Sequence, residues 1–235
     1  MQLIIAPDLL AAFPDLRIGI VTGRGVSNAG EHVAVEALKS TAADALRRDL
    51  TTETLPKHPY IAAWRETYRR FGSKASDYRP TAEALLRRVL RGETIAPIST
   101  IVDLYLAIEM EFYLPIGGYD LAHVVGDITL RFSPGDEAFL PIGATAEEKT
   151  YAGEVVYADA EKILTRRWNY RDCDAAKITT DSRDIVLLCE ATMPAIPTEH
   201  LAQCTEQLTD YLRRFCGGTL THHLLDGKTI PTYTL

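Results

Sequence analysis

The sequence changes character near residue 115, and this change constrains the fold more than any other feature. Before it, apolar residues recur at helical spacing and predict helices at about 31–50, 59–71, 80–91 and 99–112. After it, shorter segments predict strands at 127–132, 136–141, 153–158, 162–167 and 184–191. Further strands are expected at 2–5 and 17–21, a last helix at about 198–215, and a tail at 228–235. Helices followed by a sheet and a helix predict an α+β protein.

The turning point reads Pro115-Ile116-Gly117-Gly118-Tyr119-Asp120. A proline and two glycines before an aspartate predict a turn in which the backbone passes close to another group. We therefore expect Gly117 and Gly118 at the wall of a pocket.

Length and composition favour a soluble globular protein. A chain of 235 residues can bury about 70–75% of its unfolded surface, so it needs no metal or disulfide for stability. No apolar run approaches the roughly 18 residues of a membrane helix, and no basic residue precedes Arg17, so we expect no membrane contact and no signal peptide. The four cysteines form no CxxC pair, so we expect neither a metal nor another cofactor, and reduced thiols in the cytoplasm.

The segment 65–91 is locally basic, although the whole chain carries a formal net charge of −7. Amphipathic helices with solvated arginine faces would explain this excess. Arginine side chains also pair well with phosphate oxygens, so the same surface is a candidate nucleic-acid interface. Its candidate contacts are Arg69, Arg70, Lys74, Arg87, Arg88 and Arg91.

Polar and aromatic residues gather just after the strand expected at 162–167, in the stretch Trp168-Asn169-Tyr170-Arg171-Asp172-Cys173. A neighbouring arginine can lower the pKa of the Cys173 thiol, but no histidine has a recognisable catalytic spacing. Two acids stand in apolar segments, Asp103 in a helix and Glu190 at the end of a strand. A carboxylate there must be paired, hydrogen-bonded or exposed, so simple pairing of Asp103 and solvent exposure of Glu190 are the default expectations.

Several short motifs, in the same order, resemble a known family. Residues 101–104 (IVDL), 115–121 (PIGGYDL) and 126–131 (GDITLR) are similar to the B3/B4 region of the bacterial phenylalanyl-tRNA synthetase beta subunit, which reads VVDITN, FDLD and G-x-I-x-x-R there. Residues 187–191 (LLCEA) match its later LLE segment. Free-standing B3/B4-domain proteins are even more similar, through YRRFG (68–72), EALLRRV (83–89), GEVVY (153–157) and RWNYRD (167–172).

The resemblance implies an α+β, B3/B4-like layered fold with a β-sandwich of unusual topology and flanking helices. It suggests N-terminal strands and a helix that complete the fold (1–58), a B3/B4-like core (59–195), and a C-terminal helix and tail (196–235). In the synthetase this module hydrolyses mischarged tyrosyl-tRNA, so tRNA or aminoacyl-tRNA is the expected partner.

The resemblance also suggests roles for individual residues. Glu190 matches the pocket glutamate that recognises the wrong amino acid, so we expect it to orient the substrate. Arg171 would bind the ester or a phosphate, with Asp172 holding Arg171, while Asn169 and Thr179 would donate hydrogen bonds to the carbonyl oxygen. The residues expected to complete the substrate site are Asp103, Gly117, Gly118, Asp120, Trp168 and Cys173.

The sequence also departs from the synthetase motifs. Leu106 stands where VVDITN has asparagine, Gly117 stands where a histidine precedes FDLD, and residues 171–173 replace a glycine-rich GGExSG stretch. The first hypothesis is a stand-alone, trans-acting editing hydrolase of mischarged aminoacyl-tRNA. The second is a non-catalytic module that binds tRNA, an amino acid or a related small molecule, because a fold does not prove a retained activity. Chemistry at Cys173 is the third.

Overall fold

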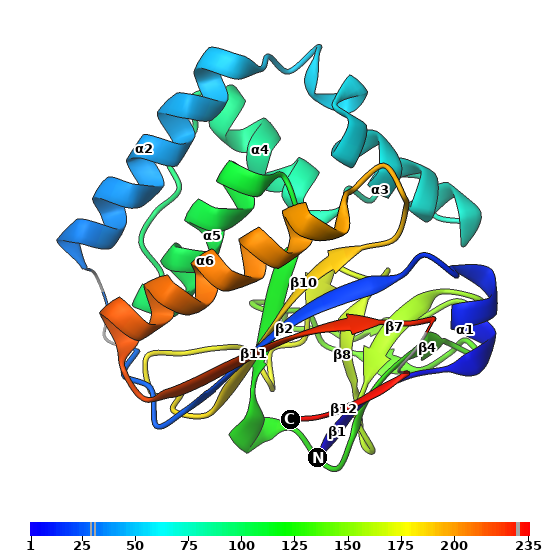
Figure 1. Cartoon of the computed structure of the whole chain (residues 1–235). Coiled ribbons are helices and arrows are strands. Elements are labelled where there is room, and N and C mark those ends of the chain that lie inside the picture. Colours follow the sequence, from blue (N-terminus) through cyan, green and yellow to red (C-terminus); the bar gives the residue numbers. More distant parts are fainter. Residues whose placement is uncertain (29, 31, 229–230) are drawn as a thin grey trace.

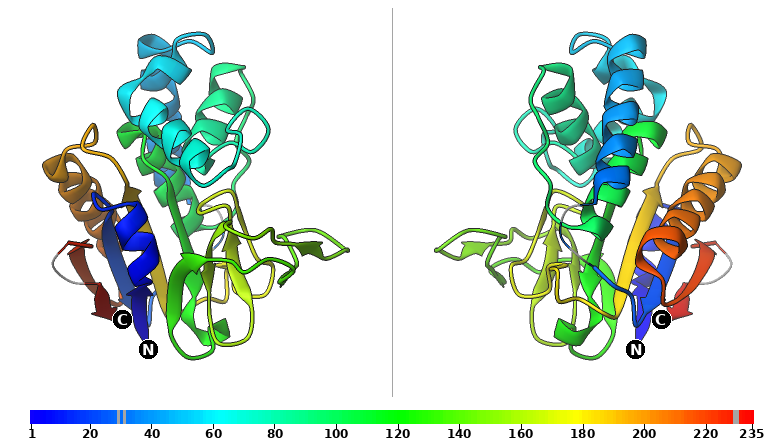
Figure 2. Two further views of the ribbon diagram at one scale, coloured as in Figure 1. Left: turned by 90° about the vertical axis from the view of Figure 1, so that its right-hand side faces the viewer. Right: turned by 90° about the vertical axis from the view of Figure 1, so that its left-hand side faces the viewer.

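Two β-sheets pack against each other beneath a group of helices (Figures 1 and 2). The computed structural model describes residues 1–28, 30, 32–228 and 231–235. The six-stranded sheet has the order β12-β1-β4-β7-β8-β9, with β12 (Thr232–Thr234), β1 (Gln2–Ile5), β4 (Ile128–Phe132), β7 (Val155–Ala158), β8 (Ile163–Arg166) and β9 (Arg171–Asp172). The four-stranded sheet has the order β11-β2-β10-β3, with β11 (Thr219–Asp226), β2 (Arg17–Arg24), β10 (Ile185–Ala191) and β3 (Ile116–Asp120). A small hairpin of β5 (Ala138–Phe139) and β6 (Glu148–Lys149) projects from one side (Figure 2).

Most of the helices lie together at one end of the two sheets (Figure 1). The helices are α1 (Pro7–Ala12), α2 (Val33–Asp49), α3 (Pro59–Arg70), α4 (Thr81–Leu90), α5 (Thr100–Phe112) and α6 (Thr198–Cys216), with short 3-10 turns η1 (Leu55–Lys57) and η2 (Leu121–His123). Helix α6 lies across the four-stranded sheet (Figure 1). It approaches so closely that a Cβ atom on Gly19 of β2 would lie 2.0 Å from the Thr205 hydroxyl oxygen of α6. None of the helices within the described residues is long and apolar enough to cross a membrane.

Strand β10 is the centre of the four-stranded sheet. It pairs antiparallel with both β2 and β3, and all seven of its residues are buried. Side chains alternate along a strand, so Leu187 and Cys189 share one face of the sheet while Val186, Leu188 and Glu190 share the other. The strand therefore carries an apolar face on one side and, on the other, a single carboxylate between the two sheets.

The prediction of a turn at Gly117 and Gly118 is wrong, because these residues lie in the edge strand β3. Neither glycine has a positive φ, and they pair with Leu188 and Leu187 of β10. The expected close approach of the backbone is confirmed: a Cβ atom on Gly118 would lie 2.2 Å from the Val186 carbonyl oxygen. Gly118 is thus required by packing and not by turn geometry.

The chain ends differ most from expectation. The expected tail contains β12, which pairs with β1, and residues 219–226, for which no element was expected, form β11 beside β2. The short helix α1 was also not expected. The predicted helix 31–50 is observed as α2, which begins at Val33 after an extended His32. Position 31 of this helix and positions 229 and 230 of the expected tail lie outside the described residues.

Substitution of Gly118 by Ala should lower the free energy of unfolding by about 1–3 kcal/mol, because the new methyl group must displace the backbone of β10. Gly117→Ala is the matched control, since its Cβ atom would meet nothing closer than Asp172 Oδ2 at 3.8 Å. Urea unfolding of both variants measures the effect. Equal stabilities would contradict this account of β3.

Candidate functional site

A small pocket opens between the two sheets, beside the helices α4 and α5. Its volume is about 110 Å³, well below the roughly 300–1,000 Å³ of pockets for drug-sized ligands, so it suits a small chemical group. Both sheets and both helices form its wall: Thr81 from α4, Tyr105 and Leu106 from α5, Gly117 and Tyr119 from β3, Tyr157 from β7, Thr165 from β8, Leu188 and Glu190 from β10, and the segment 168–172.

Glu190 is the buried acid of this pocket and is only 3% exposed, so the default expectation of solvent exposure is wrong. It accepts hydrogen bonds from the Tyr157 hydroxyl, from Trp168 Nε1 (2.8 Å) and from Asn169 Nδ2 (3.2 Å). Burial raises the pKa of Glu190 to about 7, because the three hydrogen bonds offset only part of the lost hydration. Glu190 therefore titrates close to neutral pH.

Asp172 is the second acid of the pocket. The Thr165 hydroxyl donates to Asp172 Oδ1 (2.6 Å) and also contacts the Tyr119 hydroxyl (2.6 Å). A hydroxyl has one hydrogen, so when Thr165 donates to Asp172 the Tyr119 hydroxyl must donate to Thr165. Burial raises the pKa of Asp172 to about 6, and the hydrogen bond from Thr165 opposes this shift. This chain of bonds links β3 of one sheet to β8 and β9 of the other.

A strained turn positions Trp168 and Asn169, two of the three hydrogen-bond donors to Glu190. Arg167 and Trp168 both have left-handed backbone conformations, with φ of 45° and 69°. Non-glycine residues adopt such conformations at a cost, and they persist where the surroundings hold them. Here the Trp168 ring packs edge-on against Phe13 and Trp64, with ring centroids 4.8 and 5.6 Å apart. The turn thereby directs the indole N–H and the neighbouring amide toward the carboxylate.

Arg171 lines the pocket with a side chain that is 51% exposed. Its guanidinium lies 3.8 Å from Glu148 Oε1 and 5.4 Å from the centre of the Tyr170 ring. Asp172 accepts a hydrogen bond from Thr165, whereas Arg171 lies near Glu148, so the expectation that Asp172 holds Arg171 is wrong. The guanidinium is thus available to a ligand that enters from solvent.

The structure brings six of the predicted catalytic and substrate-binding residues to this pocket: Gly117, Trp168, Asn169, Arg171, Asp172 and Glu190. The other five lie elsewhere. Asp103 pairs with Lys39 (2.8 Å), Asp120 accepts from Ser182 (2.7 Å), Thr179 accepts from Asn28 through its carbonyl (2.6 Å), Gly118 packs on β10, and Cys173 faces a different cavity.

The sequence analysis did not anticipate the hydroxyl groups of the pocket. Tyr105, Tyr119, Tyr157 and Thr165 come from four separate elements, and their spacing in the sequence gives no sign that they meet. Tyr119 stands in the PIGGYDL motif and Tyr157 in the GEVVY motif, and these motifs were the available signals.

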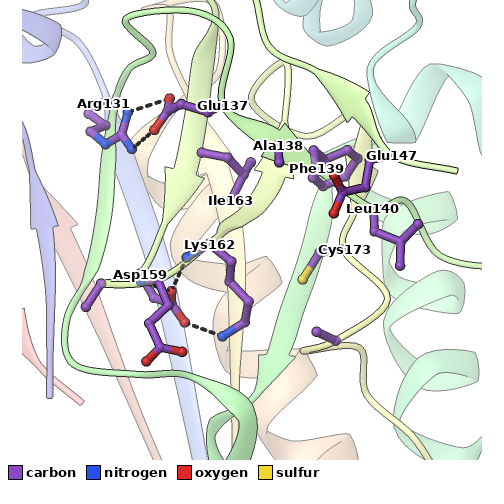
Figure 3. Close-up of a pocket in the computed structure, with 13 residues that line it drawn as sticks. Arg131, Glu137, Ala138, Phe139, Leu140, Glu147, Asp159, Lys162, Ile163 and Cys173 are labelled. Atoms are coloured by element: carbon purple, nitrogen blue, oxygen red, sulfur yellow. Dashed lines mark hydrogen bonds and ion pairs between the residues drawn. The ribbon is translucent and has the colours of Figure 1, made fainter.

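A second cavity of about 450 Å³ lies beside the β5–β6 hairpin (Figure 3). Two ion pairs border it, Arg131 with Glu137 and Lys162 with Asp159, each at 2.6 Å. The sulfur of Cys173 points toward it (Figure 3). Burial raises the pKa of the Cys173 thiol, which keeps it protonated and weakly nucleophilic at neutral pH.

The basic segment uses many of its charges within the protein. Glu83 is fully buried and pairs with Arg65 (2.7 Å), Arg87 (2.8 Å) and Arg79 (4.0 Å). Other charges are also satisfied internally: Arg69 pairs with Glu66, Arg88 pairs with Glu93, and Arg70 donates to the Ala12 carbonyl. Among the described residues, exposed Lys74 and Arg91 take part in none of the ion pairs.

Metal ligation has no obvious site in the described part of the chain, where His, Cys, Asp and Glu side chains form no group of three or more that could hold an ion. The polar groups of the pocket are instead suited to hydrogen bonds and to electrostatic interactions with a ligand.

One family model matches most of the chain. The model of the B3/4 domain matches residues 63–217, which is more than half of the sequence. This chain belongs to the B3/4 domain family. The family inferred from the sequence motifs is therefore confirmed, and every residue that lines the pocket lies within the matched range of the B3/4 domain.

The chain is also similar to solved structures, among them the crystal structure of an N-terminal fragment of the phenylalanyl-tRNA synthetase beta-subunit from Pyrococcus horikoshii. It shares 11% sequence identity with this B3/4 protein, at a TM-score of 0.47. The match covers 93% of this chain and 49% of the fragment, so the chain spans about half the length of the fragment. No curated protein matches the chain.

Glu190→Gln should change how stability depends on pH. The pKa of Glu190 is about 7 in the folded protein and 4.5 in the reference state, so the folded state binds more protons between these values. The free energy of unfolding of the wild type therefore falls as pH rises from about 4.5 to 7, by about 3 kcal/mol from this group. The Gln variant lacks this loss, so it should gain stability relative to the wild type as pH rises.

Urea unfolding at pH 5, 6, 7 and 8 measures this difference. The exposed Glu161→Gln is the matched control, and its profile should stay parallel to that of the wild type. A parallel profile for Glu190→Gln would refute the raised pKa of Glu190.

Proposed function

We propose that this B3/4 protein is a trans-acting hydrolase of mischarged aminoacyl-tRNA and that its pocket receives part of the aminoacyl group. The observation that carries the proposal is that the two oxygens of the Glu190 carboxylate accept different numbers of hydrogen bonds. Oε1 accepts from Tyr157 and Trp168, while Oε2 accepts only the longer bond from Asn169. A carboxylate oxygen can accept two bonds, so Oε2 retains a free acceptor site for a donor on a ligand.

The described residues that line the pocket include no cysteine or serine, so the attacking group that we propose is water. Water adds to the ester carbonyl carbon, the bond to the ribose oxygen breaks, and the amino acid leaves as its carboxylic acid. A proton from the water reaches the ribose oxygen, and the vicinal hydroxyl of the terminal ribose can assist this transfer. Arg171, at the exposed side of the pocket, is placed to stabilise negative charge on the carbonyl oxygen or a phosphate.

The tRNA backbone would meet the basic surface of α3 and α4. Thr81, the first residue of α4, lines the pocket, so this surface borders the site. Lys74 precedes α4 and Arg91 follows it, and both side chains are exposed. Contacts between such cations and phosphates release counterions and make binding depend on salt.

A non-catalytic role in binding tRNA, an amino acid or a related small molecule is the second candidate function. It is favoured by the position of Asp103, Asp120 and Thr179, which lie away from the pocket and leave fewer groups to act on an ester.

Deacylation of a panel of aminoacyl-tRNAs tests the first function, with tyrosyl-, phenylalanyl-, seryl- and alanyl-tRNA included. We expect the wild type to hydrolyse one or a few members. Glu190→Gln should slow this hydrolysis by about 10–100-fold, the cost of losing a hydrogen bond to a charged group. Glu161→Gln serves as the control. Full retention of tRNA binding without any hydrolysis would favour the non-catalytic role.

Lys74→Ala combined with Arg91→Ala should weaken tRNA binding and reduce the slope of log affinity against log salt by about two, if each cation meets one phosphate. Arg213→Ala is the control, because Arg213 lies on α6 and pairs with Asp210. Filter binding over a range of salt concentrations measures both slopes. An unchanged slope in the double variant would show that this surface does not bind tRNA.

A further inference from the structure

The pocket contains two acids without a basic partner, the buried Glu190 and the half-buried Asp172. Within the described residues, neither Glu190 nor Asp172 forms an ion pair, and the charge of Asp172 helps to raise the pKa of Glu190. Three buried acids show the contrast, because each has a basic partner: Asp103 pairs with Lys39, Glu83 with arginines and Glu154 with Arg166. A buried carboxylate without a counter-charge is costly. A positively charged ligand would remove this cost.

Aromatic rings form much of the remaining wall. Tyr105, Tyr119, Tyr157 and Trp168 all line the pocket, and the rings of Tyr119 and Tyr157 have centroids 6.2 Å apart. The faces of such rings attract cations, most strongly where water is excluded. Acids together with aromatic walls favour an ammonium group over a neutral hydroxyl or an anion.

Asp172 is positioned so that one oxygen can reach such a ligand. Oδ1 accepts the hydrogen bond from Thr165, and that bond is continued to Tyr119. Oδ2 faces Gly117 on β3, and a Cβ atom added to Gly117 would lie 3.8 Å from this oxygen. The absence of a side chain at Gly117 therefore leaves Oδ2 open to the pocket.

The geometry points to an ammonium-binding site in which Asp172 and Glu190 together hold a primary ammonium group of the ligand. This inference deepens the proposed function and rests on it for the identity of the substrate as an aminoacyl ester. The ammonium group has two possible sources, the α-amino group of the aminoacyl ester or an amine on its side chain. Asp172 is then the residue that makes the site select a positively charged ligand over a neutral one.

The titratable and charged groups around the site support this assignment. They are Glu109 and Tyr105 on α5, Tyr119 on β3, Tyr157 on β7, Arg171 on β9 and Glu190 on β10. Burial raises the pKa of Glu109 well above its usual value, which favours the neutral form of this acid. Without a ligand, Asp172 and Glu190 are partly protonated near pH 6–7, so binding of an ammonium group should expel protons.

Matched pairs of small probes test the site on the purified full chain. The first pair is n-butylammonium and n-butanol, which represent an amine on a side chain. The second is L-alaninamide and N-acetyl-L-alaninamide, which represent the α-amino group. Isothermal titration calorimetry at pH 7.0 in two buffers of different ionisation enthalpy gives the affinity of each probe and the protons released. The variants are Asp172→Asn and, as control, Glu161→Gln.

We expect at least one charged probe to bind about 10-fold or more tightly than its neutral partner, with release of protons. The pair that shows the preference identifies the source of the ammonium group. Asp172→Asn should abolish the preference, and Glu161→Gln should keep it. The Asn side chain can still accept from Thr165, and a thermal unfolding curve checks that the variant folds.

Equal binding of charged and neutral probes by the wild type, or no binding of either pair up to 100 mM, overturns the inference without reference to any variant. A preference that survives in Asp172→Asn overturns the role of Asp172. These outcomes are independent of deacylation: a B3/4 protein that prefers the charged probes but hydrolyses no aminoacyl-tRNA would keep the ammonium site and lose the proposed hydrolysis.

Discussion

The buried carboxylate of Glu190 is the interaction on which the arrangement of the two sheets depends. It lies on β10, the central strand of one sheet, whereas its donors Tyr157 and Trp168 belong to β7 and to the turn after β8. A buried acceptor that loses its donor costs about 1–3 kcal/mol or more, so each of these donors is needed. The Tyr119–Thr165 bond makes a second link between the sheets close by.

The residues that join the sheets are also the residues that form the pocket. The backbone strain at Arg167 and Trp168 is consistent with this double role, because strained conformations persist where packing holds them and are common at functional sites. Two partly desolvated acids lie at this point, where we propose a site that prefers a positively charged group. Local departures from the rules of stable packing of this kind are expected where a protein binds its ligand.

Sequence periodicity was a good guide to elements whose burial follows a local pattern. Helices α3 to α6 and strand β10 begin and end within two residues of the predicted limits, because one apolar face repeats along each of them. The edge strands were harder. Strand β3 was taken for a turn because Gly117 and Gly118 are turn residues, whereas Gly118 serves close packing on β10. Strands β11 and β12 pair with segments some two hundred residues away, which no local pattern records.

The sequence by itself determined helices α2 to α6, the buried strand β10, the α+β class and, through the order of its motifs, the B3/4 family. It also singled out Asn169, Arg171, Asp172 and Glu190 as chemically unusual. Only the tertiary structure decided that these four share a pocket while Asp103, Asp120 and Thr179 do not, and that hydroxyl groups from four elements complete it. The physical reason is that ionisation and hydrogen bonding depend on distance and burial in space, which the spacing of residues along the chain does not specify.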